Sequence, residues 1–486
     1  MLTQIINLLN AAVGRKQEFE ELIQAKDIDR VIGKMESHRE RSEEALLEYD
    51  PSKHKINERA DKRVLDKNGN LKRTIKRWKL PIDYCKFINE IALVFIYGQP
   101  VKWGQTSTDT DEAFDAVTNL LKDVHFDSKI KQCKRYAGAE TQSAMLFRVF
   151  KNKHGNPDCQ VRVLAFSKGD EIFTRWDEYE NLLSFGWGHY VTDGDDTRYH
   201  FDLYTDETIY HCVRGGKGWE MTEEDNLIGK IPVIYFEQEK EWDGVFPLIE
   251  REEYIASRSA DVNDYFSDPM LILDADIIKN LPERDDENKT LIKTSGADTH
   301  AAAGYLTWDS ASASKEAEKE WLQKQILTKT FTPNIDFDTM RQLSNVSGKA
   351  LKQMMILANI KASKRKETHD EMMDRVAGLC TSIVGNVLNV SLRNQCDKLI
   401  ITHEFQDPFG EDVADVINNI TKAKDGGFLS TESAVELSPT TKNVKTEMER
   451  LAEDREAAEA AQRDLFAQTA LAATGVSEGT DEGLAD

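Results

Sequence analysis

The chain has 486 residues and a mass of 55.3 kDa, which exceeds one small domain and predicts roughly two to four structural units. Hydrophobic residues make up 40% of the chain and charged residues 31%, so wholesale disorder is excluded and no disulfide staples are needed. Acidic residues outnumber basic ones by 86 to 63, a net charge of −23. This balance argues against a protein that grips nucleic acid by neutralising phosphates, but it does not exclude one that lets DNA slide past.

The cysteines are scattered, with no CxxC pair and no histidine at zinc spacing. They predict buried thiols in a reducing compartment rather than a disulfide framework or a structural zinc site. The longest apolar run, residues 91–97, is far shorter than the about 20 residues that cross a bilayer, so we expect no transmembrane helix. The extreme N-terminus has the period of an amphipathic helix and no signal-peptide features, which favours a cytosolic chain.

In chain order, residues 1–50 show helical periodicity that ends at Pro51. Residues 52–80 then carry eleven basic and three acidic residues around an Asn-Gly-Asn turn at 68–70. We expect a solvated, mobile surface loop here, with a patch for nucleic acid or an acidic partner as the open alternative. Residues 81–101 predict a buried helix that is stopped by a Gly-x-Pro turn.

Short alternating runs separated by turn clusters predict antiparallel hairpins over residues 143–236. Two helices follow, at about 247–266 and 312–330, the second ending before Pro333. Between them, residues 268–312 predict two or three short strands. The two helices therefore bracket a small β-containing excursion.

Residues 347–393 form the longest periodic segment, with Ser347 as a plausible N-cap. At about 1.5 Å per residue, an unbroken helix of this length would be roughly 70 Å long. The sequence then predicts a strand at 398–405, a helix at 411–424 and the start of a further helix at Ser430. We expect residues 466–486 to form a disordered acidic tail. The predicted fold class is α+β.

Few catalytic chemistries fit the sequence. The run around Gly348 and Lys349 imitates a phosphate-binding loop, but Leu343 stands where the first glycine belongs and Ala350 where the Mg²⁺-binding hydroxyl belongs. No metalloprotease helix or nucleophile elbow is present. Acidic pairs at 195–196, 223–224 and 285–286 could hold Mg²⁺ for a nuclease, although such pairs more often mark solvated turns. We predict no enzyme, cofactor or metal site.

The order of features resembles the portal proteins of tailed double-stranded-DNA bacteriophages. Residues 91–101 (IALVFIYGQPV) are similar to the family's apolar helix and turn, and residues 228–236 (IGKIPVIYF) to its strand before the first stem helix. Residues 344–352 (SNVSGKALK) resemble the opening of its long helix, and residues 426–449 its C-terminal helix-turn-helix. One departure is the run Phe-Pro-Leu at 246–248, where many relatives have Ser-Asp.

The resemblance implies a portal fold that assembles as a ring. The implied segments are a wing (1–245), stem helix 1 (246–267), a small α/β clip (268–311), stem helix 2 (312–331), a tunnel loop (332–346), a long helix with a wing strand (347–409), a crown (410–465) and the acidic tail (466–486). A head-to-tail interface that closes is consistent with this reading, since the stem and clip have too little apolar surface for a core of their own.

The resemblance also implies a function. The ring, expected to be a dodecamer, would be the head–tail connector at the capsid vertex of the virion, for packaging, translocation and ejection of viral double-stranded DNA. Its implied partners are the terminase, which supplies the ATPase, the major capsid and scaffolding proteins, and head-completion adaptor proteins, with no membrane. During assembly it would lie in the host cytoplasm. The alternatives are a metal-dependent nuclease or DNA-modifying enzyme, and a capsid scaffold that never contacts DNA.

Candidate DNA-facing residues come from the same resemblance. The acidic lumen is expected to repel the duplex toward the axis while a few cations guide it. On the second stem helix these are Lys324 and Lys329, which could equally be solvent or intersubunit ion-pair residues, as could Arg341. The tunnel-loop candidates are Thr332, Asn334, Asp336, Asp338, Arg341, Gln342 and Asn345.

Overall fold

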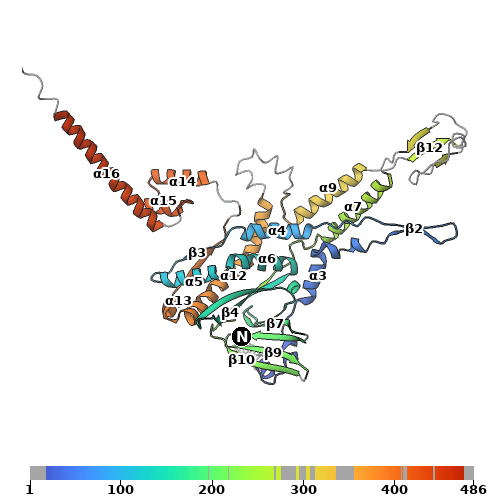
Figure 1. The fold of residues 1–486 in the computed structure, drawn as a ribbon, viewed down its shortest axis with the longest axis horizontal. Helices are drawn as coiled ribbons and strands as arrows, with labels where there is room; N and C mark the ends of the chain where they lie inside the picture. The colour runs from blue at the N-terminus through green and yellow to red at the C-terminus, as the bar shows by residue number, and fades with distance from the viewer. Residues whose placement is uncertain are drawn as a thin grey trace, which may run out of the picture. The chain divides into compact units, whose positions relative to one another are not determined.

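The computed structural model describes residues 18–194, 196–216, 218–266, 270–274, 292–294, 303–306, 312–334, 355–406, 408, 413–441 and 444–474. The chain divides into two compact units, Met1–Pro408 and Phe409–Asp486, and each is described by itself. Helices and sheets both contribute to the first unit, so the predicted α+β class is confirmed (Figure 1).

The N-terminal part of the first unit is helical. A helix over residues 18–24 is followed by α2 (Ile28–Gly33) and α3 (Arg39–Tyr49). Their apolar residues, including Phe19 and Val31, pack against Phe201 of a neighbouring sheet. The predicted helical periodicity is confirmed from residue 18 onward, and residues 1–17 lie outside the described part.

Two antiparallel sheets occupy residues 142–237, which confirms the predicted hairpins. The five-stranded sheet follows the chain from β6 (Glu171–Trp176) through β7 (Leu182–Asp193), β8 (Asp196–Tyr204) and β9 (Thr208–Gly215) to β10 (Gly218–Asp225). In the three-stranded sheet, β4 (Gln142–Lys151) lies between β5 (Pro157–Leu164) and β11 (Val233–Glu237). Apolar side chains of both sheets, such as Leu146 and Phe185, share one core cluster.

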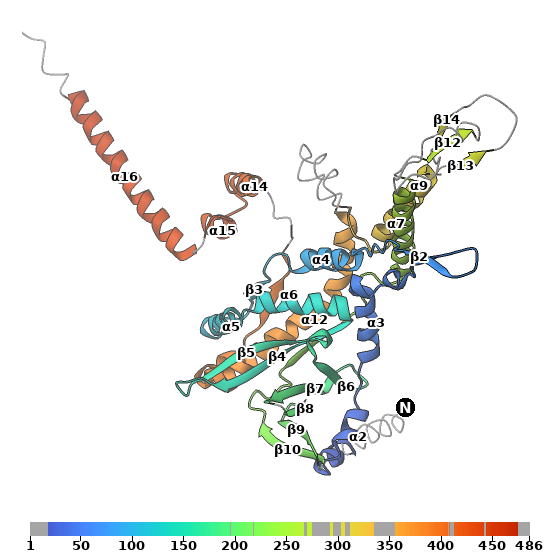
Figure 2. The ribbon, with the colours of Figure 1, turned by 45° about the vertical axis from the view of Figure 1, so that its right-hand side comes forward.

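Helices cover the other side of the three-stranded sheet. α6 (Phe126–Glu140) packs on β4 and β5, and α4 (Tyr84–Tyr97) packs on α6 (Figure 2). α4 is the predicted buried helix. α5 (Asp111–Asp123) and α6 meet at His125, whose left-handed φ of 55° ends one helix and begins the next. β3 (Lys102–Gln105) pairs with β15 (Ile401–Glu404), which is the predicted late strand.

The cysteines behave as predicted, because all six are free and buried. In the described part of the chain, no helix is both long and apolar enough to span a membrane.

The long helix ends earlier than predicted. α12 covers Ile356–Ile383, and the expected start at Ser347 lies outside the described residues. A π-helical turn (Val384–Leu388), a 3₁₀ turn (Val390–Leu392) and α13 (Arg393–Cys396) then replace the expected straight course to 393. Gly385 lets the chain fold back, since a Cβ there would lie 3.1 Å from that of Cys396. Asn386 donates to the carbonyl of Ile228 at 2.8 Å, which holds the turn against the sheet layer.

The basic segment is also more ordered than predicted. After the 3₁₀ turns Pro51–Lys53 and Lys55–Glu58, β1 (Lys62–Leu65) and β2 (Leu71–Ile75) form an antiparallel hairpin instead of a loop. The carboxylate of Asp66 accepts hydrogen bonds from the backbone N–H groups of Asn68 and Asn70, both at 2.8 Å. This Asx-type contact organises the turn that the Asn-Gly-Asn run marks.

The helix pair and the small sheet between its members are as predicted. α7 covers Phe246–Phe266 and α9 covers Ser312–Lys329. Between them, β12 (Met270–Asp274) pairs in parallel with β13 (Ile292–Thr294) and antiparallel with β14 (Ala303–Leu306).

The second unit is helical in its described part. It contains α14 (Val413–Asp425), α15 (Thr431–Leu437) and α16 (Val444–Thr474). Ser430 is the N-cap of α15, as predicted, and accepts a hydrogen bond from Ser433 N at 3.1 Å. The predicted disorder of 466–486 is wrong over 466–474, which belongs to the alanine-rich α16, because alanine is the strongest helix former. Residues 475–486 lie outside the described part.

Candidate functional site: a helix pair and its anchors

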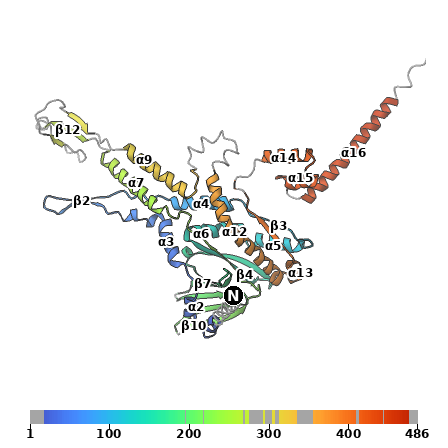
Figure 3. The same cartoon turned by 180° about the vertical axis from the view of Figure 1, so that it is seen from behind.

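α7 and α9 form an antiparallel pair (Figure 3). Ile249 of α7 and Ile326 of α9 are fully buried in one apolar cluster. Arg251, two residues further along α7, donates to Glu318 Oε1 of α9 at 2.9 and 3.0 Å from two of its nitrogens. Trp242 and Val245, just before α7, share the cluster with residues of α4, so the pair is fixed to the body of the first unit.

The predicted stem cations are exposed. Neither Lys324 nor Lys329 forms an ion pair with another residue that the structure describes. Five residues at about 100° each place the two side chains about 140° apart around the helix. The two lysines therefore lie on different faces of α9. If one face of α9 lines the channel, only one of the two side chains can point directly at the DNA.

The predicted loop residues separate into three groups. Thr332 is buried, at 3% exposure, and its hydroxyl lies 3.0 Å from that of Thr330. In this conformation its side chain anchors the end of α9, which corrects the prediction that it faces DNA. Asn334 is exposed. Asp336, Asp338, Arg341, Gln342 and Asn345 lie outside the described residues.

α9 ends in a Schellman motif with an unusual residue. Thr332 N donates to Leu327 O at 2.9 Å, and Phe331 N donates to Thr328 O at 3.1 Å. The residue between the helix and Thr332 needs a left-handed backbone, which is normally supplied by glycine. Here Phe331 takes a φ of 53° with its ring 42% exposed, so the exit from the helix stores strain.

An extended segment, residues 78–82, runs along α7. The backbone N–H groups of Trp78, Leu80 and Ile82 donate, respectively, to side chains of Asp261, Ser257 and Glu253 at 2.7–2.9 Å. Two residues of an extended chain span about 6.6 Å, and four residues of a helix span about 6 Å. Every second residue of the segment can therefore meet every fourth residue of α7. Residues 78–82 therefore run antiparallel along α7 and fix the base of the hairpin.

Sequence reasoning missed a buried ion pair beneath this segment. His54 Nδ1 lies 2.6 Å from Glu253 Oε1, and His54 Nε2 lies 2.9 Å from Glu48 O. Both the Glu253 carboxylate and the Glu48 carbonyl are acceptors, so the arrangement favours the protonated ring, which donates from both nitrogens. Burial alone would lower the pKa of His54, but the hydrogen bonds to Glu253 and Glu48 outweigh burial and raise it. Burial raises the pKa of the neighbouring Glu252 carboxyl.

A second buried group links three distant segments. Glu241 precedes α7, and its carboxylate contacts Lys134 of α6, with both side chains fully buried. It also lies 2.9 Å from Lys361 and 3.4 Å from Arg365, both on α12. Burial would raise the pKa of Glu241, but the three cations outweigh burial and hold it far below its usual range. We name Glu241, Lys134, Lys361 and Arg365 the junction cluster.

A neutral histidine lies beside the junction cluster. The hydroxyl of Tyr97 lies 2.8 Å from His369 Nδ1, and both residues are buried. Burial lowers the pKa of His369 well below its ordinary value, so the ring is neutral and adds no further positive charge. No sequence motif marks the junction cluster, although Lys361 and Arg365 share a helix face at a spacing of four residues.

The described acidic pairs do not converge. Glu223 and Glu224 are exposed on β10, and Asp196 pairs with Arg198 at 2.7 Å. Asp195, Asp285 and Asp286 lie outside the described residues. Within the described ranges, no group of three or more His, Cys, Asp or Glu side chains could hold a metal ion. A cavity of about 730 Å³ between residues 19–24, the five-stranded sheet and α12 has no histidine or cysteine among its lining residues.

A family model described as "Phage portal protein, SPP1 Gp6-like" matches residues 17–461. The chain belongs to the phage portal protein family. No curated protein sequence matches it. The resemblance drawn from the four sequence stretches is therefore confirmed at the level of the family. The phage portal family is structural rather than enzymatic in general, forms oligomeric rings, and is associated with the capsid vertex and DNA.

Proposed function

We propose that this phage portal protein forms the ring-shaped channel at the capsid vertex through which double-stranded DNA is packaged and ejected. The observation that carries the proposal is the antiparallel pair α7 and α9, which brackets the small β12–β14 sheet within a chain that matches the portal family over residues 17–461. A helix pair held to a body at one end is suited to line a channel when copies are arranged around an axis.

In this proposal α7 and α9 are the stem, residues 268–311 the clip and residues 410–465 the crown. Residues 1–245 form the wing, with β15 as the wing strand that follows the long helix. Residues 332–346 form the tunnel loop, and the part that follows the buried Thr332 and Pro333, beginning at the exposed Asn334, faces DNA. The ring is a dodecamer, its clip docks the terminase and later the adaptor proteins, and the capsid and scaffolding proteins surround it.

Charge supports a channel rather than a clamp. The net charge of −23 means that a ring of copies repels a duplex from its walls unless cations lie close to it. Every phosphate contact adds affinity through counterion release and would slow translocation. Because Leu343 and Ala350 stand where a phosphate-binding loop needs a glycine and a hydroxyl, the work of packaging comes from a separate ATPase, and this chain provides the passage.

The test has two parts. Negative-stain images and native mass of the purified protein should show rings with a central hole. Residues 335–346 are then replaced by a Gly-Ser linker that keeps the buried Thr332 and Pro333. Particles should assemble with this variant but package poorly. Normal packaging would remove the tunnel-loop assignment, and a monomer that cleaves plasmid with Mg²⁺ would favour the nuclease.

A further inference from the structure

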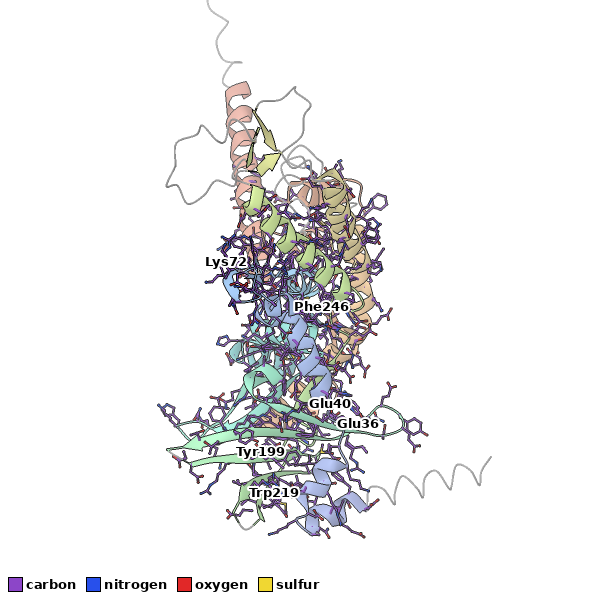
Figure 4. All side chains as sticks on the ribbon, turned by 90° about the vertical axis from the view of Figure 1, so that its right-hand side faces the viewer. Glu36, Glu40, Lys72, Tyr199, Trp219 and Phe246 are labelled. Atoms are coloured by element: carbon purple, nitrogen blue, oxygen red, sulfur yellow. The ribbon has the colours of Figure 1, made fainter. Side chains whose placement is uncertain are left out.

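The β1–β2 hairpin is the feature that the proposed function leaves unexplained. The figures show its base close to α7 and its turn projecting away from that helix, and Lys72, on β2, is labelled in Figure 4. Eight of its nine strand residues are exposed, and Val64 is half-buried. An isolated two-stranded hairpin is at best marginally stable in water, because neither face has a core to bury.

The base of the hairpin is nevertheless held firmly. Besides the three backbone contacts of residues 78–82 with α7, Arg59 pairs with Asp261 at 2.7 Å and donates to Trp78 O at 2.9 Å. The Trp78 indole donates to Asp264 at 2.5 Å. Because both ends are anchored to one helix, the direction of the hairpin is set before any partner binds, which reduces the entropy cost of docking.

The hairpin carries unpaired positive charge. Its cationic side chains form no ion pair with any other residue that the structure describes. By contrast, exposed arginines elsewhere in the first unit, such as Arg39 and Arg251, have carboxylate partners. The unpaired cations are Lys62, Arg63, Lys67, Lys72, Arg73, Lys76 and Arg77.

Apolar side chains lie among these cations. Leu65 and Leu71 are paired across the strands near the turn, with exposures of 56% and 57%, and Ile75 is 37% exposed. Apolar side chains add nothing to phosphate binding but contribute strongly to a protein interface. A surface that combines unpaired cations with an exposed leucine pair therefore favours an acidic protein partner over DNA.

We propose that the hairpin docks on a carboxylate-bearing surface of the next copy of this chain in the ring. Charge complementarity favours a second copy of the chain as the partner, because each copy has a net charge of −23 while the hairpin is basic. A ring interface is heterologous, so the hairpin of one subunit meets a different surface on its neighbour. The inference rests on the proposed ring and adds a specific contact that stabilises it.

Zero-length carbodiimide crosslinking tests this contact directly. Rings are assembled from equal amounts of ¹⁴N- and ¹⁵N-labelled full-length chain, treated with carbodiimide, and digested for mass spectrometry. Coupling of Lys62, Lys67 or Lys72 to carboxylates in peptides of mixed isotope is the expected result. Hairpin crosslinks that occur only within one subunit would overturn the inference.

Charge reversal gives the second readout. A variant with K62E, R63E, K72E and R73E should raise the concentration of half-assembly by about tenfold or more, because like charges then face each other. The matched control reverses Lys151 and Lys153, exposed cations near the β4–β5 turn, and should assemble as the wild type does. Circular dichroism of each variant checks its fold.

The outcomes separate the two proposals. Wild-type rings together with unchanged assembly of the hairpin variant would overturn the hairpin contact and leave the portal ring standing. If the variant assembles normally but loses affinity for a 40-bp duplex, the hairpin contacts DNA, and the inference is wrong. Wild-type protein that forms no ring would overturn both proposals.

Discussion

The Nζ of Lys361 lies 2.9 Å from Oε2 of Glu241 in the interior of the first unit, and this contact joins α12 to the turn that precedes α7. Glu241 is followed directly by Trp242, which is fully buried in the cluster that holds the stem pair. α12 is the first described helix after residues 335–354. The junction cluster therefore links the two ends of the segment that contains the stem helices and the proposed tunnel loop.

Glu241→Gln should destabilise the first unit strongly. The substitution keeps the size of the side chain but leaves Lys134, Lys361 and Arg365 without their shared carboxylate. Removing one partner of a buried ion pair typically costs about 3–5 kcal/mol, because the remaining charge stays desolvated. Urea titration gives the free energy of unfolding.

The control is Glu239→Gln, an exposed carboxylate two residues away. Its free energy of unfolding should stay within about 0.5 kcal/mol of the wild type. Equal effects of the two substitutions would mean that the junction cluster does not hold the segments together.

Phe331 provides a test of backbone strain at the exit of α9. Phe331→Gly and Phe331→Ala both remove the ring, but only glycine adopts the φ of 53° without steric cost. We expect the glycine variant to be more stable than the alanine variant by about 1 kcal/mol. Thermal unfolding of the two proteins measures the difference. Equal stability, or greater stability of the alanine variant, would show that Phe331 does not have a left-handed backbone.

The buried pair of His54 and Glu253 predicts a pH dependence. The pKa of His54 is raised in the folded protein, so the stabilisation is fully present below the unfolded value of about 6.5 and is lost as pH rises through the folded pKa. The difference in unfolding free energy between wild type and His54→Gln should therefore be larger at low than at high pH across this window. The exposed His154, replaced in the same way, is the control. A difference that grows with rising pH would contradict the assignment.

Lys324 and Lys329 should differ in their effect on DNA. Lys329 lies in the last turn of α9, where a cation is stabilised by the helix dipole, so we expect a structural role for it. If Lys324 faces the duplex, Lys324→Gln should reduce the slope of log affinity against log salt by about 0.9 for each copy in the ring that contacts a phosphate, while Lys329→Gln should leave the slope unchanged. Binding of a 40-bp duplex to rings over a salt series provides the measurement. A reduced slope for Lys329→Gln, with no change for Lys324→Gln, would show that Lys329 is the residue that faces the DNA.

Helices and strands with a clear hydrophobic periodicity could be predicted from the sequence. Elements whose conformation depends on contacts between distant residues could not. Residues 246–266 and 312–329 are helices, as their sequence pattern indicated. The sequence predicts a loop at the hairpin because a run of like charges usually marks a solvated surface. The hairpin is ordered because Arg59 and Trp78 at its base bind to α7. The local sequence pattern does not reveal these contacts.

The junction cluster could not be predicted from the sequence, because it too depends on contacts between distant residues. Glu241 is one of 86 acidic residues, and nothing in its neighbourhood marks it as buried beside three cations. The break after Ile383 depends on the packing of Gly385 against Cys396, a tertiary contact. The portal family, by contrast, could be inferred because short motifs occur in the right order along the chain.

Electron microscopy of the purified full-length protein, paired with its native mass, tests the proposed ring most directly. We expect symmetric rings whose central hole is wide enough for a DNA duplex and whose mass is a multiple of 55.3 kDa, with twelve copies. A monodisperse single subunit over the whole accessible range of concentration and salt, with no ring in any particle, would contradict the proposal.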